Sequence, residues 1–391
     1  MKKRISTVLI LGAVCLYMLP AEGGSRIKFI KGNIGDKTAA VREASDAEAA
    51  GLAGDAIDFV LANKAVLGDD RDLDALAVAG VLALPPAAVA SYDQKAKDAL
   101  AGDLKQLFMQ FTGDTVRIAV ITKAVMLKDS VSVDSFAQTL NDFLQSTNGT
   151  SPDNGVVKAA VTALGTIGGS QSFTVIYGCI VQKKWPQYLN EMNSALSMLA
   201  DKALPQIIGI IQEGDTKNIR PLFDLLCKND KNSASFKAEI AENVLSETIY
   251  IADNSSTVTK ETAGLQLDAM RVISQLKWTR SSAVMISFFS LAKREYAAGV
   301  LNDDEFAEVI TGTAIIAPID GTPVLSSYLT ELNKQTESGT KTSDTVVLAV
   351  INALGAIGDK SSFDSLLYVT YVSYPETVIA AARDALARLK W

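Results

Sequence analysis

One stretch of this sequence occurs twice, and that repetition constrains the fold more than any other feature. Residues 154–173 and 344–363 share ten identities without a gap, at a constant offset of 190. The shared residues of the first copy are Val156-Val157, Ala159, Ala163-Leu164-Gly165, Ile167-Gly168 and Ser172-Phe173. Self-similarity of this kind indicates a repeat architecture, in which each unit packs on its neighbours.

The second copy has the pattern of an amphipathic helix that ends in a glycine turn. Apolar residues recur at helical spacing over 346–354, and Gly355 and Gly358 can end the helix in the left-handed conformation. Oxygen atoms within 359–362 can cap a second helix, and Pro375 can begin a third. Each helix is too narrow to bury its apolar stripe alone, so we expect the helices to stack.

This pattern resembles the second helix and inter-repeat turn of HEAT repeats of the PBS-lyase HEAT-like kind. The arginine that usually follows the first valine is present as Arg117, but Val157 and Val347 replace it in the two copies. The resemblance is carried by residues 114–182 and 343–391. It implies an all-α fold, an α–α superhelix of stacked antiparallel helix pairs, which binds protein or peptide partners on its concave face. It identifies no particular partner, since the family hosts many unrelated roles.

The first 23 residues have the pattern of a secretory signal peptide. Met1-Lys-Lys-Arg precedes an apolar run over residues 5–19, and Ala21-Glu-Gly23 fits a small-x-small cleavage site. Lipidation at Cys15 and an uncleaved anchor are the alternatives. We therefore expect an exported protein, periplasmic or secreted, with no membrane insertion after cleavage.

The remaining chain is predicted to have one short segment and one large domain. Charged and apolar residues alternate near the start of residues 24–35, which favours a short extended segment. Helical patterns follow at spacings mostly near 40 residues, the HEAT period, and no linker is long enough to separate domains. We expect residues 36–391 to form a single solenoid, with an uncertain register between about 187 and 280.

Composition excludes several classes of chemistry. The chain contains no histidine, which rules out Ser-His-Asp and Cys-His catalysis and every histidine-ligated metal site. The processed chain has 34 basic and 43 acidic residues, a net charge of −9, which argues against a nucleic-acid partner. Only Cys179 and Cys227 remain, predicted as core thiols, with a disulfide as the alternative. We expect no cofactor.

Two weak motifs have structural explanations that fit better than a functional one. Asp70, Asp72 and Asp74 resemble the start of a calcium loop, but Ala75 and Val81 stand where the loop requires Gly and Glu. Acidic residues at a helix N-terminus explain these residues better. Ser290 and Lys293 match Ser-x-x-Lys, but the companion motifs of that enzyme class are absent, so one ordinary helix face is the preferred interpretation.

A line of polar residues is the candidate partner-binding site. Each precedes a small-apolar pair on a predicted second helix, and together they are expected to form a stripe on the concave side: Lys123, Thr162, Ser194, Asn243, Asn352 and Asp384. The alternative is an ordinary solvated helix face. The predicted function is a non-catalytic scaffold that binds protein or peptide, with envelope assembly as a candidate role. The competing hypothesis is a periplasmic hydrolase with a carboxylate pair in the groove.

Overall fold

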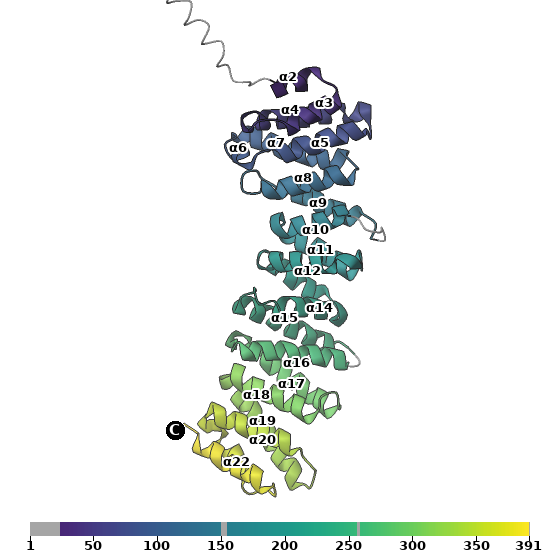
Figure 1. Ribbon diagram of the computed structural model, residues 1–391. Helices are drawn as coiled ribbons and strands as arrows, with labels where there is room; N and C mark the ends of the chain where they lie inside the picture. Colours follow the sequence, from purple (N-terminus) through teal and green to yellow (C-terminus); the bar gives the residue numbers. More distant parts are fainter. Residues whose placement is uncertain (1–23, 150–154, 256–258, 391) are drawn as a thin grey trace, which may run out of the picture. The chain divides into compact units, whose positions relative to one another are not determined.

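The computed structural model describes residues 24–149, 155–255 and 259–390, and these ranges form helices and turns without a β-strand. The predicted signal peptide, residues 1–23, lies outside the described part of the chain. Consecutive helices pack against one another in sequence order (Figure 1). The predicted all-α, superhelical solenoid fold is therefore confirmed.

The chain divides into two compact units, residues 1–203 and 204–391, where the sequence suggested a single array. The boundary lies within the range of uncertain register, about 187 to 280, where residues 187–213 were expected to exceed one helix and in fact contain two longer helices, residues 189–199 and 204–213. The helices of unit 1 are α2 Gly24–Lys31, α3 Ile34–Arg42, α4 Asp46–Leu67, α5 Arg71–Ala83, α6 Pro86–Ala90, α7 Gln94–Gln110, α8 Asp114–Met126, α9 Asp134–Ser146, α10 Gly155–Ile167, α11 Ser170–Val181 and α12 Leu189–Leu199.

Unit 1 contains two rows of helices. Helix α4 pairs with α5, α7 with α8, α9 with α10 and α11 with α12. The first member of each pair packs on the next first member, and α5, α8, α10 and α12 likewise follow one another. We call α4, α7, α9 and α11 the first row of unit 1, and α5, α8, α10 and α12 its second row.

Unit 2 has the same two-row organisation. Its first row is α13, α15, α17, α19 and α21, and its second row is α14, α16, α18, α20 and α22. The bounds are α13 Leu204–Glu213, α14 Thr216–Cys227, α15 Ala234–Asp253, α16 Lys260–Gln275, α17 Ser282–Ala297, α18 Asp303–Ile316, α19 Pro318–Glu337, α20 Asp344–Ile357, α21 Phe363–Val369 and α22 Glu376–Ala387.

The expected extended segment at 24–35 is wrong, because helix α2 occupies most of it. Its alternating pattern places Phe29 inside, while Ile27 and Ile30 remain 56% and 65% exposed. Among the described residues no strand is present that could pair with an extended segment here. A helix satisfies its own backbone hydrogen bonds without such a partner, so the helix forms.

Short polar side chains begin several helices, as the sequence pattern requires. The Asp93 carboxylate accepts a hydrogen bond from the Ala96 amide at 2.8 Å, and Asn302 accepts one from the Glu305 amide at 2.9 Å. The Glu305 side chain in turn accepts from the Asn302 amide, which completes a capping box. These caps fix where each helix starts, and so fix which face each helix buries.

The duplicated stretch has the same place in both units. It runs from α10 into α11 in unit 1 and from α20 into α21 in unit 2, with Ser172 and Ser362 both buried. A Cβ atom on Gly165 would lie 2.9 Å from Ala195 Cα, and one on Gly355 would lie 2.8 Å from Ala385 Cβ. These glycines therefore allow α10 and α12, and α20 and α22, to approach closely.

Two further expectations concern the cysteines and the membrane. Cys179 lies in unit 1 and Cys227 in unit 2, and both are free thiols whose pKa values are raised by burial. Among the described residues no single helix is long and apolar enough to cross a membrane; residues 186–202 and 204–213 reach that length and apolar content only as a bent pair.

Candidate functional site

Lys123 does not belong to an exposed stripe, and its prediction as a binding residue is wrong. Its side chain is buried on α8, and the ammonium donates hydrogen bonds to the Leu82 and Leu84 carbonyl oxygens at 2.9 and 2.7 Å. Burial lowers its pKa. Lys123 therefore caps the C-terminal end of α5 and ties two neighbouring second-row helices together.

The burial pattern of the second row shows why the register was off by one residue. Five helices share one burial pattern, in which two buried residues are followed by one residue that faces outward and then by two more buried residues. The pattern lies at 120–124, 160–164, 266–270, 309–313 and 350–354. In α8 the outward position is Thr122, and Lys123 occupies the buried position that Ala163 and Ala353 hold elsewhere. The long lysine chain replaces a small apolar residue there because its ammonium reaches carbonyl groups.

The other two predicted residues of unit 1, Thr162 and Ser194, lie in a line with Thr122. Thr122, Thr162 and Ser194 are exposed on α8, α10 and α12, which pack successively against one another. The Thr122 hydroxyl donates to the Ile118 carbonyl oxygen at 2.8 Å, and the Thr162 hydroxyl donates to that of Lys158 at 2.9 Å. We call these three residues the polar row of unit 1.

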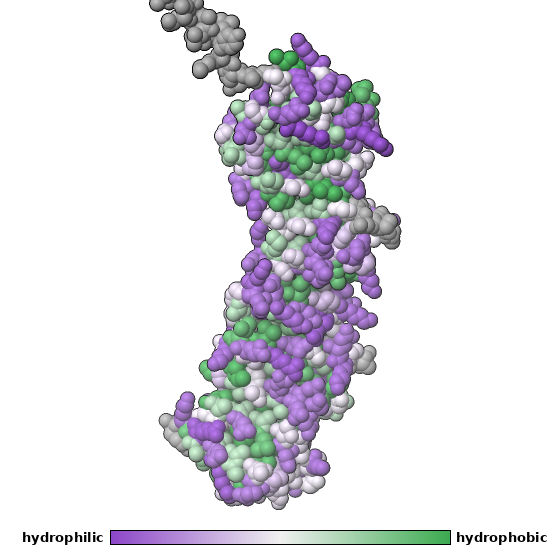
Figure 2. Space-filling model, viewed as in Figure 1, coloured by the Kyte–Doolittle hydropathy of each residue, from purple (hydrophilic) through white to green (hydrophobic). Residues whose placement is uncertain are grey.

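Apolar side chains flank this row one helical turn further along. Met126 follows Thr122 by four residues and is 54% exposed, and Met198 follows Ser194 by four and is 52% exposed. Leu82 on α5 is 50% exposed. Figure 2 shows apolar side chains gathered over α5 and α8 on the face in view. The second row of unit 1 therefore presents hydroxyl groups beside flexible apolar side chains.

Asn243 lies on the wrong row for the predicted stripe. It is on α15, a first-row helix, and its amide donates to the Glu239 carbonyl oxygen at 2.8 Å. The apolar pair that follows it, Val244-Leu245, is buried, so the local pattern was correct. Helices of both rows bury such pairs, and sequence alone could not tell the rows apart where the register was uncertain.

The corresponding outward positions of unit 2 are carried by five consecutive second-row helices. Asn352 and Asp384 are exposed on α20 and α22, as predicted. The burial pattern adds three residues that the sequence reading missed. We call the full set the polar row of unit 2: Asp224, Asp268, Thr311, Asn352 and Asp384.

Ion pairs link the first three helices of this row. Arg220 on α14 contacts Asp224 at 3.2 Å and Asp268 on α16 at 2.7 Å. Arg271 contacts Asp268 at 2.8 Å and Glu308 on α18 at 2.7 Å. The hydrogen bonds that Arg271 donates to the Glu308 and Asp268 carboxylates raise its pKa. Figure 2 shows hydrophilic side chains gathered across α14 to α16.

A small groove lies beside Thr311 between α16 and α18. Its volume is about 180 Å³, and Met270, Arg271, Glu308 and Gly312 are among the residues that line it. Gly312 keeps it open, since a Cβ there would meet the Met270 sulfur at 2.5 Å. The groove holds one carboxylate, which Arg271 already engages at both oxygens.

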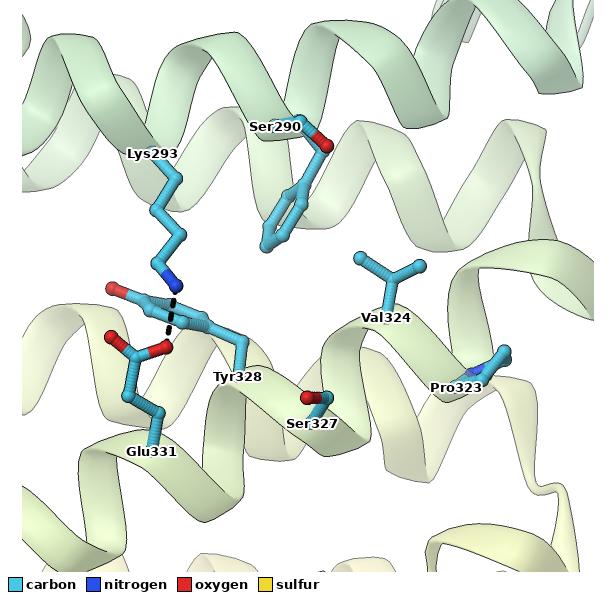
Figure 3. Close-up of a pocket in the computed structure, with 8 residues that line it drawn as sticks. Ser290, Lys293, Pro323, Val324, Ser327, Tyr328 and Glu331 are labelled. Carbon is cyan, nitrogen blue, oxygen red and sulfur yellow. Dashed lines mark hydrogen bonds and ion pairs between the residues drawn. The ribbon is translucent and has the colours of Figure 1, made fainter.

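A larger hollow of about 510 Å³ lies on the first row, between α17 and α19 (Figure 3). The Lys293 ammonium pairs with the Glu331 carboxylate and lies 5.0 Å from the centre of the Tyr328 ring. Val324 and Pro323 lie toward the other end, as Figure 3 shows. Pro323 has no amide hydrogen for the Ile319 carbonyl, so α19 lacks one of its regular hydrogen bonds at this point.

The Ser-x-x-Lys residues both line this hollow but are not arranged as an activated nucleophile. The Ser290 hydroxyl donates to the Ile286 carbonyl oxygen at 3.1 Å, and Lys293 is paired with Glu331. The competing hydrolase hypothesis needs two converging carboxylates. Among the residues that the structure describes, each of these two hollows contains one carboxylate. A basic side chain already pairs with that carboxylate in both cases.

The acidic cluster at 70–74 is organised around a helix cap and a lysine. The Asp70 carboxylate accepts hydrogen bonds from the Asp72 and Leu73 amides, both at 2.9 Å. The buried Lys64 ammonium lies 3.0 Å from Asp69 and 3.9 Å from Asp74. Burial raises the pKa of Asp74 although Lys64 lowers it. The Asp70 cap fits the helix N-terminus that the sequence favoured over a calcium loop, whereas the ion pairs of Lys64 were not predicted.

Comparison with known proteins adds no family to this picture. No protein-family model matches the sequence, and a search of curated proteins gives no match.

Proposed function

We propose that this chain is an exported, non-catalytic HEAT-like scaffold that binds an extended protein or peptide segment along its second-row helices. The resemblance of residues 114–182 and 343–391 to HEAT repeats supports the assignment, together with the paired, two-row stacking of helices. The signal-like pattern of residues 1–23 supports export.

The observation that carries the proposal is the recurrence of one outward position on successive stacked helices. Thr122 and Thr162 in unit 1 occupy the same place in the burial pattern as Thr311 and Asn352 in unit 2, and Ser194 likewise precedes a buried pair. Within each unit, side chains at equivalent positions of stacked repeats form a line, which suits a partner that runs along the stack. A compact small molecule would contact only one or two of them.

The hydrogen bonds of the row indicate what the partner offers. Thr122, Thr162 and Thr311 each donate their hydroxyl hydrogen to their own helix. Each oxygen can still accept a hydrogen bond. The partner must therefore supply donors at intervals, and the backbone amides of an extended peptide do so. Beside unit 1, Met126 and Met198 can adapt to its apolar side chains.

The test is site-specific photocrosslinking in the full-length exported protein. A photoreactive phenylalanine derivative replaces Thr162 in one variant, Asn352 in another and Thr174 in a control. Thr174 is also exposed, but it lies on the first-row helix α11. We expect the same protein adduct from Thr162 and Asn352 and none from Thr174. Equal adducts at all three positions, or none at Thr162 and Asn352, would contradict the proposal.

A second experiment measures how charged substitutions change partner capture and the melting temperature. Thr162→Arg and Asn352→Arg should each reduce capture of the crosslinked partner at least about tenfold, since a bulky charge blocks the row, while Thr174→Arg leaves capture unchanged. The melting temperature should stay within about 2 °C in all three variants because the positions are exposed. Wild-type capture should change little with salt, since Asp224 and Asp268 of the polar row of unit 2 are already paired with Arg220.

A further inference from the structure

The hollow on the first row of unit 2 combines a charged end with an apolar end. Pro323 and Val324 lie at the apolar end, and Lys293 and Glu331 meet above Tyr328 at the charged end (Figure 3). Phe289 also lines the hollow. A second hollow of about 450 Å³ shares Ser327 and Glu331 with the first and continues along α19 past Lys334, Gln335 and Ser338. The two hollows therefore form one groove along α19.

The positive and negative charges that line this groove do not cancel. They are Lys293, Lys334 and Glu331, which sum to one positive charge. The chain as a whole carries a net charge of −7, so a cationic lining departs from its surroundings. An anion with a single charge complements this lining.

The Lys293–Glu331 pair can open without a large cost. The two side chains are 39% and 44% exposed, and ion pairs of that exposure contribute little to stability. Glu331 also has an alternative partner, because Lys334 lies three residues further along α19 and shares its side of the helix. Gln335 lies 3.4 Å from the other Glu331 oxygen and holds the carboxylate near that side. Lys293 can thus be released to a ligand.

The geometry points to a binding site for a small carboxylate with an apolar body, such as the C-terminal end of an apolar peptide or a free branched carboxylic acid. The carboxylate replaces Glu331 at the Lys293 ammonium, and the apolar body lies against Phe289, Val324 and Pro323. The exposed hydroxyl groups of Ser290 and Ser327 border the space between. A hollow of about 510 Å³ is within the usual size range of small-ligand sites.

This site lies on first-row helices, so it does not depend on the proposed partner-binding rows. The test is a ligand-observed NMR titration of the full chain with N-acetyl-leucine, and N-acetyl-leucinamide serves as the uncharged analogue. We expect a dissociation constant on the order of 1 mM for the acid, as suits so small a ligand, and at least about tenfold weaker binding of the amide. A parallel titration with 4-methylpentanoate distinguishes a free acid from a peptide end.

Two variants move the affinity in opposite directions. Lys293→Met should weaken binding at least about tenfold, while Glu331→Gln should strengthen it about threefold, because the glutamine no longer competes for Lys293. Lys360→Met and Glu337→Gln, which change exposed charges outside the groove, should leave the affinity unchanged.

Several results would overturn the assignment. Equal binding of acid and amide would do so, as would unchanged affinity in Lys293→Met. Weaker binding in Glu331→Gln would show that the carboxylate contacts the ligand rather than competing with it. If Lys293→Met fails to fold by circular dichroism, the Glu331→Gln titration alone decides between these outcomes.

Discussion

At the scale of single residues, Glu295 is the least satisfied group in the described part of unit 2. It is 2% exposed on α17, and neither carboxylate oxygen has a hydrogen-bond partner within the protein. Burial raises its pKa to about 7; Arg294 opposes that effect and Asp253 adds to it. Arg294 itself pairs with Asp253, so the effects of these two charges on Glu295 partly offset each other. The folded protein therefore favours protonated Glu295.

This environment predicts a pH-dependent stability. Because the pKa is raised on folding, the contribution of Glu295 is present at acidic pH and is lost as pH rises from about 4.5 toward 7. The loss is on the order of 3 kcal/mol, or about 5–10 °C in melting temperature. Glu295→Gln should remove this slope and raise the melting temperature at pH 8. Circular dichroism melts at pH 5 to 8 measure it, with the exposed Glu261→Gln as control; an unchanged slope in Glu295→Gln would contradict the account.

Lys123 provides a second residue-scale prediction. Lys123→Met keeps the apolar stem but leaves the Leu82 and Leu84 carbonyl groups without their donor. We expect a loss of about 1–3 kcal/mol in the free energy of unfolding, measured by urea denaturation of the full chain. The neighbouring variant Thr122→Val removes an exposed hydroxyl and should change stability by less than about 0.5 kcal/mol. Equal losses of unfolding free energy in the two variants would show that Lys123 does not cap α5.

At the scale of helices, close approach depends on single glycines. Gly355 lies against Ala385 where α20 meets α22, and Gly165 lies against Ala195 where α10 meets α12. Both contacts involve backbone atoms of the facing helix, which cannot move aside as the end of a flexible side chain can. The spacing of these helices is therefore set by the absence of a side chain.

Substitutions at two helical glycines should have opposite effects. Gly355→Ala introduces a methyl group 2.8 Å from Ala385 Cβ and should cost about 1–3 kcal/mol. Gly264→Ala, on α16, meets no atom within 4 Å and should stabilise the protein by about 0.5–1 kcal/mol through the higher helix propensity of alanine. Thermal melts of both variants test this, and Ala385→Gly combined with Gly355→Ala should recover part of the loss. If Gly355→Ala leaves the stability unchanged, the close approach of α20 and α22 does not depend on this glycine.

The same helices show how far the sequence could predict the site. The spacing of Val346, Val350 and Leu354 predicted the buried face of α20 correctly, and Gly358 ends the helix as expected, but Gly355 lies inside the helix and does not stop it. Lys123 was misplaced because a lysine can occupy a buried position when its ammonium reaches carbonyl groups, which no local pattern reveals. Asn243 was assigned to the wrong row because row membership depends on contacts between helices. The hollow at Lys293 depends on Glu331 from another helix, so one motif could not predict it.

At the scale of the whole molecule, the last helix covers the second row of unit 2. Helix α22 packs on α20 and α21, and its residues Val378, Ala382 and Ala385 are buried there. Its other side carries Arg383 and Asp384, both exposed. A helix with one apolar and one charged face is what the end of a repeat array requires.

Removal of this helix should therefore expose an apolar surface. A chain that ends at residue 374 loses the helix that packs on α20 and α21, and we expect it to aggregate and to melt at lower temperature. Light scattering and circular dichroism measure the two effects. Arg383→Ala combined with Asp384→Ala, which keeps the helix, should remain soluble. A truncated chain that stays monomeric and melts as before would disprove a capping role for α22.

The offset of the duplicated stretch has a meaning beyond packing. It is 190 residues, nearly the length of unit 2, and in each unit the stretch lies near the end, followed by a helix that carries Ala195-Leu196 or Ala385-Leu386. Two blocks with this correspondence point to an ancestral internal duplication. Thr162 then corresponds to Asn352, and Ser194 corresponds to Asp384. Both outward positions differ between the copies, whereas the buried Ala163-Leu164 and Ala353-Leu354 pairs are identical, so one chain displays two versions of a single surface.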